Sequence, residues 1–295
     1  MSKDLGASVR ARLLNIAKEQ GADFNQVLVR FALERLLYRL SQSEHADRFL
    51  LKGALLFTLW YDMPHRSTRD ADLLGFGPSD LDSILQTFRQ IASVTVDDAI
   101  VFDPDSVTVE PIRRDARYSG VRIMISSELA NARCRTQVDV GFGDAVTPGP
   151  VHATYSVLLS DFPAPRLRTC PVYTVIAEKL HAIASIGMAN TRMKDYLDLW
   201  VLLEREKLNR RTLARAIAAT FTRRSTVVPV VVPIGLSDEF GSDPSRQALW
   251  KGFLAKNELA VVSLLDVVAA IRSALQPAME QAVIVAAERG TTSGG

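Results

Sequence analysis

The stretch HRSTRDADLLGFG, residues 65–77, places two aspartates one residue apart on a predicted strand that runs into a glycine turn. Because successive side chains of a strand point to opposite faces, Asp70 and Asp72 share one face while Ala71 and Leu73 pack beneath them. Two carboxylates this close repel each other unless a cation compensates. The pair therefore predicts a site that holds one divalent ion.

A second predicted strand, QVDV at residues 137–140, offers a third carboxylate. Alternation places Asp139 on the polar face of this strand, where it joins the first two aspartates if the two strands pair. Three oxygen ligands without His or Cys are typical of Mg²⁺ or Mn²⁺, which take further ligands from substrate phosphates. A simpler alternative stays open, because D-x-D near a turn is commonly solvated turn chemistry and Asp139 could be a surface residue.

Glycine and basic residues around the aspartates indicate a phosphate site. A helix that begins near Gly53 would aim unpaired backbone N–H groups at an anion such as a triphosphate, with Lys52 beside it. Arg66 and Arg69 flank the D-x-D motif and could counter its carboxylates or contact phosphate. The alternative is an ordinary loop glycine next to a solvated lysine.

The composition excludes several classes of protein. No apolar run approaches the length of a bilayer span, and residues 1–10 lack the apolar core of a secretory signal, so we expect a cytoplasmic protein without a membrane segment. Two cysteines and four scattered histidines give neither a disulfide framework nor zinc-ligand spacing. With a net charge of +2, nucleic-acid binding would depend on local clusters of Lys and Arg.

Periodicity divides the chain into three segments. Residues 1–50 are predicted to be helical, with Asp23 as an N-cap. Residues 51–165 hold short β-rich runs and one early helix that begins at Ser79, and residues 166–295 return to helical spacing. We therefore expect an α+β fold in which N-terminal helices pack on a sheet domain and a helical lobe follows.

The helical lobe carries a group of charges. Lys179 stands in an apolar neighbourhood, where an ammonium is costly unless it meets an anion. Lys194, Asp195 and Asp198 fall close together on another predicted helix. The simpler alternative is that Lys194 and Asp198 form an i,i+4 pair on the surface.

Taken together, the motifs LLKGALLF, STRDADLLGFG, QVDVGFGDAV, VIAEKLHA and RMKDYLDLW resemble those of the AbiEii-type nucleotidyltransferase toxins. These toxins are a branch of the polymerase-β-like superfamily that includes the mycobacterial MenT toxins. The resemblance spans nearly the whole chain. It implies a mixed nucleotidyltransferase sheet with an N-terminal helical segment and a helical C-terminal lobe. It also implies an NTP substrate and Mg²⁺ or Mn²⁺.

The resemblance assigns roles residue by residue. It implies three metal ligands, which are Asp70, Asp72 and Asp139. It implies a catalytic set of Asp70, Asp72, Asp139, Lys179 and Asp195. It implies that Gly53, Lys194 and Asp198 bind the nucleotide. Lys52, Arg66 and Arg69, which the residue pattern around the D-x-D motif singles out, complete the expected nucleotide-binding set. The last motif begins at Arg192 and reads R-x-K-D-x-x-D in the family.

One departure from the superfamily pattern concerns the phosphate site. Many members have Gly-Ser before the D-x-D motif, whereas Ala54 follows Gly53 in this chain. No hydroxyl there can touch a phosphate. Backbone amides must therefore bind the nucleotide phosphates at this position.

Toxins of this kind use an NTP to add nucleotides to RNA, in the MenT case to the tRNA 3′ end, which blocks aminoacylation and so inhibits translation and growth. The resemblance also implies a protein antitoxin, a DNA-binding repressor made from the adjacent gene. Residues 192–224 hold nine Lys or Arg against four acids, which predicts an RNA-binding surface, although a solvated helix face has the same composition. Two other functions stay open: nucleotidyl or phosphoryl transfer to a protein, and a non-catalytic nucleotide- or RNA-binding module.

Overall fold

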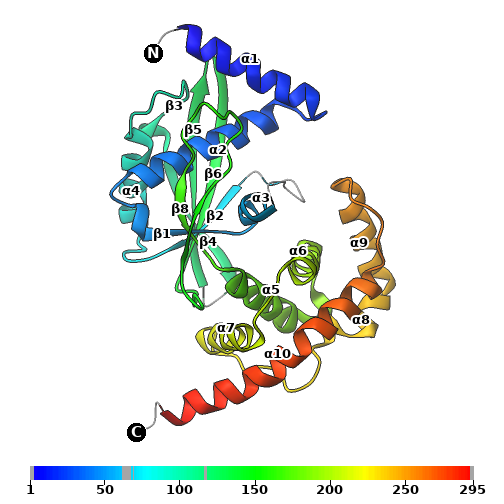
Figure 1. Ribbon diagram of the computed structural model, residues 1–295. Coiled ribbons are helices and arrows are strands. Elements are labelled where there is room, and N and C mark those ends of the chain that lie inside the picture. The colour runs from blue at the N-terminus through cyan, green and yellow to red at the C-terminus, as the bar shows by residue number, and fades with distance from the viewer. Residues whose placement is uncertain (1–2, 62–67, 69, 116–117, 293–295) are drawn as a thin grey trace. The chain divides into compact units, whose positions relative to one another are not determined.

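The chain divides into two compact units in the computed structural model, which describes residues 3–61, 68, 70–115 and 118–292 (Figure 1). The first unit comprises Met1–Gly143 and Val151–Thr169, and the second comprises Asp144–Pro150 and Cys170–Gly295. The N-terminal helices therefore belong to the same unit as the sheet. The chain enters the second unit at residues 144–150, returns to the first, and passes into the second again after Thr169.

An eight-stranded mixed sheet lies at the centre of the first unit as the structure describes it, which confirms the expected α+β class. The strand order is β3-β5-β6-β2-β1-β8-β7, and β4 also pairs with β5. The β2–β6 and β1–β8 pairs are parallel and the other pairs are antiparallel. The strands are β1 Phe49–Lys52, β2 Asp70–Gly75, β3 Val101–Phe102, β4 Thr108–Asp115, β5 Tyr118–Leu129, β6 Ala132–Phe142, β7 Val151–Thr154 and β8 Arg166–Thr169.

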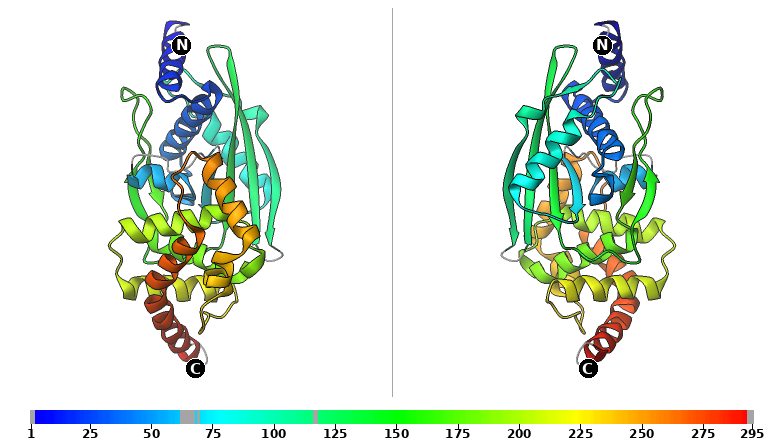
Figure 2. Two further views of the ribbon diagram at one scale, coloured as in Figure 1. Left: turned by 90° about the vertical axis from the view of Figure 1, so that its right-hand side faces the viewer. Right: turned by 90° about the vertical axis from the view of Figure 1, so that its left-hand side faces the viewer.

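The β5–β6 hairpin fixes the register of the site strands. Its two turn residues, Ala130 and Asn131, have positive φ angles of 45° and 66°, as a two-residue type I′ turn requires. Leu129 and Ala132 therefore face each other across the turn, and the pairing continues without a shift to Gly120 and Gly141. The two long strands of this hairpin are seen in both views of Figure 2.

Two helices, α2 (Phe24–Gln42) and α4 (Leu81–Ser93), contact each other and the sheet. The carboxylate of Asp23 accepts hydrogen bonds from the backbone N–H groups of Asn25 and Gln26, which confirms the expected N-cap. The expected cap of α4 at Ser79 is wrong by one residue, because the carboxylate of Asp80 accepts the N–H of Ser83 at 2.8 Å. The remaining helices of this unit are α1 Lys3–Glu19 and α3 Leu55–Tyr61.

Two buried charged side chains of α2 bind the backbone of the segment that connects β7 to β8. Glu34, on α2, accepts the backbone N–H of Leu158 at 2.7 Å, and Arg35 donates to the carbonyl of Pro163 at 2.9 Å. Burial raises the pKa of Glu34 to about 7 although the neighbouring Arg35 acts against this shift. These contacts stabilise the segment that leads into β8.

The second unit is helical, as the spacing of residues 172–220 predicts. Helices α5, α6 and α7 follow one another along the chain, and both α6 and α7 contact α5 and α10. None of the described helices is long and apolar enough to span a membrane. The helices are α5 Val172–Ile186, α6 Met193–Arg205, α7 Arg210–Arg223, α8 Asp238–Ser242, α9 Pro244–Lys256 and α10 Leu264–Thr292.

Candidate active site

Four charged residues stand side by side across four strands of the sheet. Lys52 on β1 is the register partner of Asp72 on β2, Asp72 is the partner of Asp139 on β6, and Asp139 is the partner of Arg122 on β5. Register partners on neighbouring strands point to the same face. Lys52, Asp72, Asp139 and Arg122 therefore form a charge row in which two basic residues flank two acids.

The opposite face of the same strands is apolar and explains why the row is fixed. Ala71, Leu73, Val138 and Val140 are each at most 2% exposed. A slip of one residue in either strand would bury the aspartates and expose these side chains. The hydrophobic pattern thus keeps Asp72 and Asp139 on the polar face, and the observed register sets them opposite each other.

Arg122 binds the carboxylate of Asp139 through two parallel hydrogen bonds. Its Nε lies 2.9 Å from Oδ1 and its Nη2 lies 3.0 Å from Oδ2. Asp139 is only 4% exposed, and Gln137 also donates to it at 3.2 Å. The hydrogen bonds to Asp139 raise the pKa of Arg122 above its ordinary value, and the charges of Glu110 and Asp70 act in the same direction.

Asp70 lies two residues before Asp72 on the same face of β2. Its register partner on β6 is Gln137, and its Oδ1 accepts the hydroxyl of Thr68 at 2.7 Å. Both Asp70 and Asp72 are partly exposed, in contrast to Asp139. Asp70 and Asp72 thus lie at the surface of this face of the sheet, whereas Asp139 lies below it.

Gly53 is required by the close approach of Asp72. Its φ angle of 73° is one that side chains disfavour, and a Cβ atom built there would lie 2.1 Å from Oδ2 of Asp72. Any other residue at position 53 would displace the Asp72 carboxylate. The helix expected to begin near this glycine is α3, which starts at Leu55 and spans seven described residues.

The donor set formed by Asp70 together with Asp72 of the charge row fits a hard divalent ion. Asp70 and Asp72 offer carboxylate oxygens on one face, and His and Cys are absent from their register partners. The residues that the structure describes contain no group of three or more His, Cys, Asp and Glu side chains arranged to hold a metal. The structure thus shows no preassembled three-carboxylate centre in this part of the chain, and metal binding by Asp70, Asp72 and Asp139 stays a prediction.

A second group of charges lies inside the helical unit. The ammonium of Lys179, on α5, lies 3.0 Å from Oδ1 of Asp195 and 2.6 Å from Oδ2 of Asp198, both on α6. The Nε of Arg192 lies 2.6 Å from the other oxygen of Asp195. The side chains of Asp195 and Asp198 are each 1% exposed. We call these four residues the helix ion cluster.

Burial and charge oppose each other in the helix ion cluster. Burial acts to raise the pKa of Asp195, but Lys179 and Arg192 outweigh it, so the pKa lies below its ordinary value. The expected need of Lys179 for an anion is therefore met by two carboxylates. Asp198, the acid of the alternative i,i+4 pair with Lys194, is buried and binds Lys179.

The structure locates most of the residues that the sequence singles out. Arg66 and Arg69 lie outside the described residues, and Lys194 is exposed on α6. Sequence reasoning missed Arg122. The turn at Asn131 could have revealed it, because pairing outward from a two-residue turn places Arg122 opposite Asp139.

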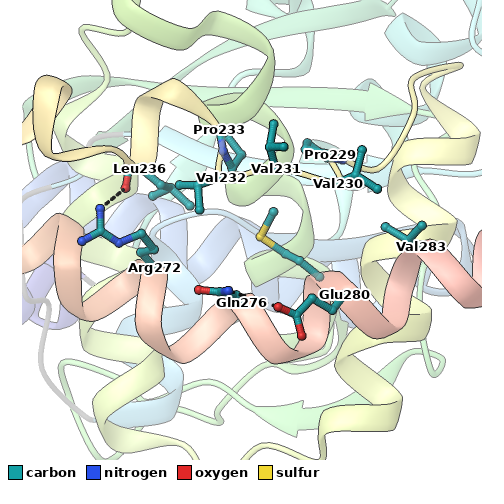
Figure 3. A pocket seen from close by; sticks show the side chains of 11 residues that line it. Pro229, Val230, Val231, Val232, Pro233, Leu236, Arg272, Gln276, Glu280 and Val283 are labelled. Carbon is teal, nitrogen blue, oxygen red and sulfur yellow. Dashed lines mark hydrogen bonds between the residues drawn. The ribbon is translucent and has the colours of Figure 1, made fainter.

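A cavity of about 210 Å³ lies elsewhere in the second unit, between α10 and the segment of residues 229–236 (Figure 3). Its lining is mostly apolar and includes Val230, Val231 and Met279, with Arg272 and Glu280 as charged members. Arg272 donates to the backbone carbonyl of Leu236 at 3.2 Å. None of the residues that the sequence singles out lines this cavity.

Comparison with known proteins identifies the class of this one. The model of the family described as nucleotidyl transferase AbiEii toxin, type IV toxin–antitoxin system, matches residues 35–281. The chain therefore belongs to the AbiEii family and is a nucleotidyltransferase. A comparison with curated proteins finds no match.

Two solved structures from Helicobacter pylori are similar to this chain. The protein JHP933 is 14% identical with a TM-score of 0.46, and the match covers 90% of this chain and 96% of that one. The second, described as a candidate nucleotidyltransferase, is 14% identical with a TM-score of 0.42, and covers 86% of this chain and 94% of its own.

Proposed function

We propose that the protein is a cytoplasmic toxin that transfers a nucleoside monophosphate from an NTP to the 3′ end of an RNA, and that the RNA is tRNA. This modification would block aminoacylation and so inhibit translation and growth. The observation that carries the proposal is the charge row, which sets Asp72 beside Asp139 on one face of the sheet. Membership of the AbiEii family supports the toxin and the reaction class.

Asp70 and Asp72 are proposed to hold Mg²⁺ or Mn²⁺ together with the triphosphate. Both carboxylates are partly exposed on the same face of β2, and Gly53 leaves room for that of Asp72. A divalent ion held there would offset the negative charge of the triphosphate as pyrophosphate leaves. Lys52, next to Asp72 in the charge row, and Arg66 and Arg69 are proposed to contact the phosphates.

Asp139 is proposed to join the metal ligands or to accept the proton of the RNA 3′-hydroxyl. A buried carboxylate that is held in one orientation suits either role. Its hydrogen bonds to Arg122 and Gln137 supply that orientation. The α-phosphate would then be attacked in line by the 3′-hydroxyl oxygen, and the bond to pyrophosphate would break.

Lys179 and Lys194 are proposed to stabilise the β- and γ-phosphates as charge moves onto them. Asp195 and Asp198 are proposed to orient Lys179, and the distances of 3.0 and 2.6 Å from its ammonium support this role. The buried position of both acids also supports a structural role, which a stability measurement separates from a catalytic one.

The helix α7 is proposed to contact the RNA backbone. Arg210, Arg211 and Arg215 are exposed on it, whereas its apolar residues are buried. Exposed arginines bind phosphates through charge, so this contact should weaken as salt rises. The type IV toxin–antitoxin family implies an antitoxin, and we propose that it is a DNA-binding repressor made from the adjacent gene.

Labelled nucleotides test this proposal. The purified protein is incubated with Mg²⁺, total tRNA and an NTP labelled at either the α- or the γ-phosphate. We expect α-label on tRNA and none from γ-labelled NTP, and we expect Asp72→Asn to lose the transfer while Asp82→Asn, an exposed residue of α4, retains it. Label on protein instead of RNA would establish the alternative acceptor, and no label on either would indicate a binding module.

A further inference from the structure

We infer that Arg122 is a positioning residue that holds the Asp139 carboxylate ready for metal and RNA. This inference rests on the proposed function, because it gives Asp139 its role. It concerns a residue that neither the motifs nor the family resemblance singles out.

The contact geometry is the first argument. Nε and Nη2 of Arg122 lie 2.9 and 3.0 Å from the two oxygens of Asp139, so both atoms of the carboxylate are bound at once. A planar guanidinium that binds both oxygens restricts rotation of the carboxylate, which a single contact would not do. Asp139 is 4% exposed, so water contributes little to holding its charge.

The direction of approach is the second argument. In the strand order, β5 and β2 lie on opposite sides of β6. The backbone of Arg122 therefore lies on the far side of Asp139 from Asp72. Its guanidinium also feels the charge of Asp70, so it belongs to the same charged surface as the partly exposed aspartates. An arginine placed there can fix the orientation of Asp139 relative to the other two carboxylates.

Another pair on the same hairpin shows what an ordinary cross-strand contact looks like. Arg133 and Glu128 are also register partners on β6 and β5, but they make one contact at 3.2 Å and are 87% and 43% exposed. Exposed pairs of this kind contribute little. The burial of Asp139 and the two-bond geometry set the Arg122 pair apart.

The test measures Mn²⁺ affinity without NTP or RNA, by titration calorimetry of the full chain. Arg122→Gln removes the charge and one of the two bonds, and Arg133→Gln is the matched control. We expect Arg122→Gln to weaken Mn²⁺ binding about 10- to 100-fold, as loss of residues behind metal ligands commonly does. The control should bind as the wild type does. Steady-state transfer should show a lower kcat with a smaller change in the KM for NTP.

Arg122→Lys keeps the test decisive if the glutamine variant does not fold, as judged by circular dichroism. A lysine ammonium cannot make two parallel bonds, so we expect Mn²⁺ affinity between those of wild type and Arg122→Gln. Affinity equal to or tighter than wild type in the folded Arg122 variants would overturn the inference. So would a wild-type protein that binds no Mn²⁺. A wild type that binds Mn²⁺ in an Arg122-dependent way but transfers no nucleotide would instead overturn the proposed function alone.

Discussion

The charge row of the sheet and the helix ion cluster combine the same residue types in different surroundings. In the sheet, Asp70 and Asp72 are partly exposed, and only Asp139 is buried against an arginine. In the helical unit, Asp195 and Asp198 are buried and both bind Lys179. Partly exposed acids can exchange partners with a ligand, whereas removing the ammonium shared by two buried acids leaves their charges uncompensated. Activity and stability measurements should therefore respond differently to changes in the two regions.

Removal of Lys179 should produce the largest effect on stability. Lys179→Met leaves two buried carboxylates without their ammonium, which should lower the free energy of unfolding by about 3–5 kcal/mol. Urea denaturation at pH 7 measures this change, with Lys251→Met on α9, an exposed lysine, as the control. A loss below about 1 kcal/mol would show that the helix ion cluster is not structural.

Asp72→Asn should produce the largest effect on activity. It removes the charge but keeps the size of the side chain next to Gly53, so the fold should tolerate it. We expect nucleotide transfer to fall about 100- to 1,000-fold, the range for loss of one electrostatic group in an active site. Rates are compared at saturating NTP and Mg²⁺, and stability is measured in parallel. Wild-type rates in this variant would contradict the role of the charge row.

Glu34 extends the comparison to a buried acid whose nearby arginine does not outweigh the effect of burial on its pKa. Its pKa is raised to about 7, so the folded protein binds a proton that the unfolded chain releases near pH 4.5. Stability should therefore fall as pH rises from about 4.5 to about 7, by up to about 3 kcal/mol. Glu34→Gln should remove this slope, whereas Glu44→Gln, a change at an exposed residue, should leave the slope as it is in the wild type. Urea denaturation midpoints of the wild type and both variants, measured at pH 5 and pH 8, test this prediction.

Asp195 should show the opposite pH dependence. Its lowered pKa means that the stabilisation is present above the ordinary carboxyl pKa of about 4 and is lost as pH falls through the lower folded value. Acid unfolding followed by circular dichroism should therefore begin below about pH 4 and should move to higher pH in Arg192→Gln, because one of the two cations that lower this pKa is removed. An unchanged acid transition in this variant would contradict the stated cause.

Substitution of the α7 arginines should produce the smallest effect per residue, and the effect should be on tRNA affinity. Alanine at Arg210, Arg211 and Arg215 together should weaken tRNA binding and reduce the slope of log Kd against log salt by about 2. A variant with alanine at Arg133, Lys251 and Lys256 loses the same charge from other exposed positions. Equal affinity of the α7 variant and wild type at low salt would exclude this surface.

Local patterns predicted much of the fold and part of the site. Alternation assigned Asp70 and Asp72 to one face of β2 and Asp139 to the polar face of β6, and the observed pairing of the two strands brings these faces together. Helical spacing located α5, α6 and α7, and Asp23 was recognisable as a cap.

Tertiary contacts account for what the sequence did not reveal. The partner of Asp139 depends on the β5–β6 register, which a turn of two residues sets. The burial of Asp198 depends on how α5 and α6 pack, so i,i+4 spacing alone suggested a surface pair. Gly53 is explained both by its positive φ angle and by the close approach of Asp72 on β2, and only the structure shows the second reason.

A crystal structure of the protein with Mn²⁺ and a non-hydrolysable NTP tests the central claim most directly, because anomalous scattering locates the metal. The account predicts a peak within coordination distance of Asp70 and Asp72, with Arg122 still bound to Asp139. A peak at Asp195 and Asp198, or Asp70 and Asp72 without metal at saturating Mn²⁺ and NTP, would contradict it.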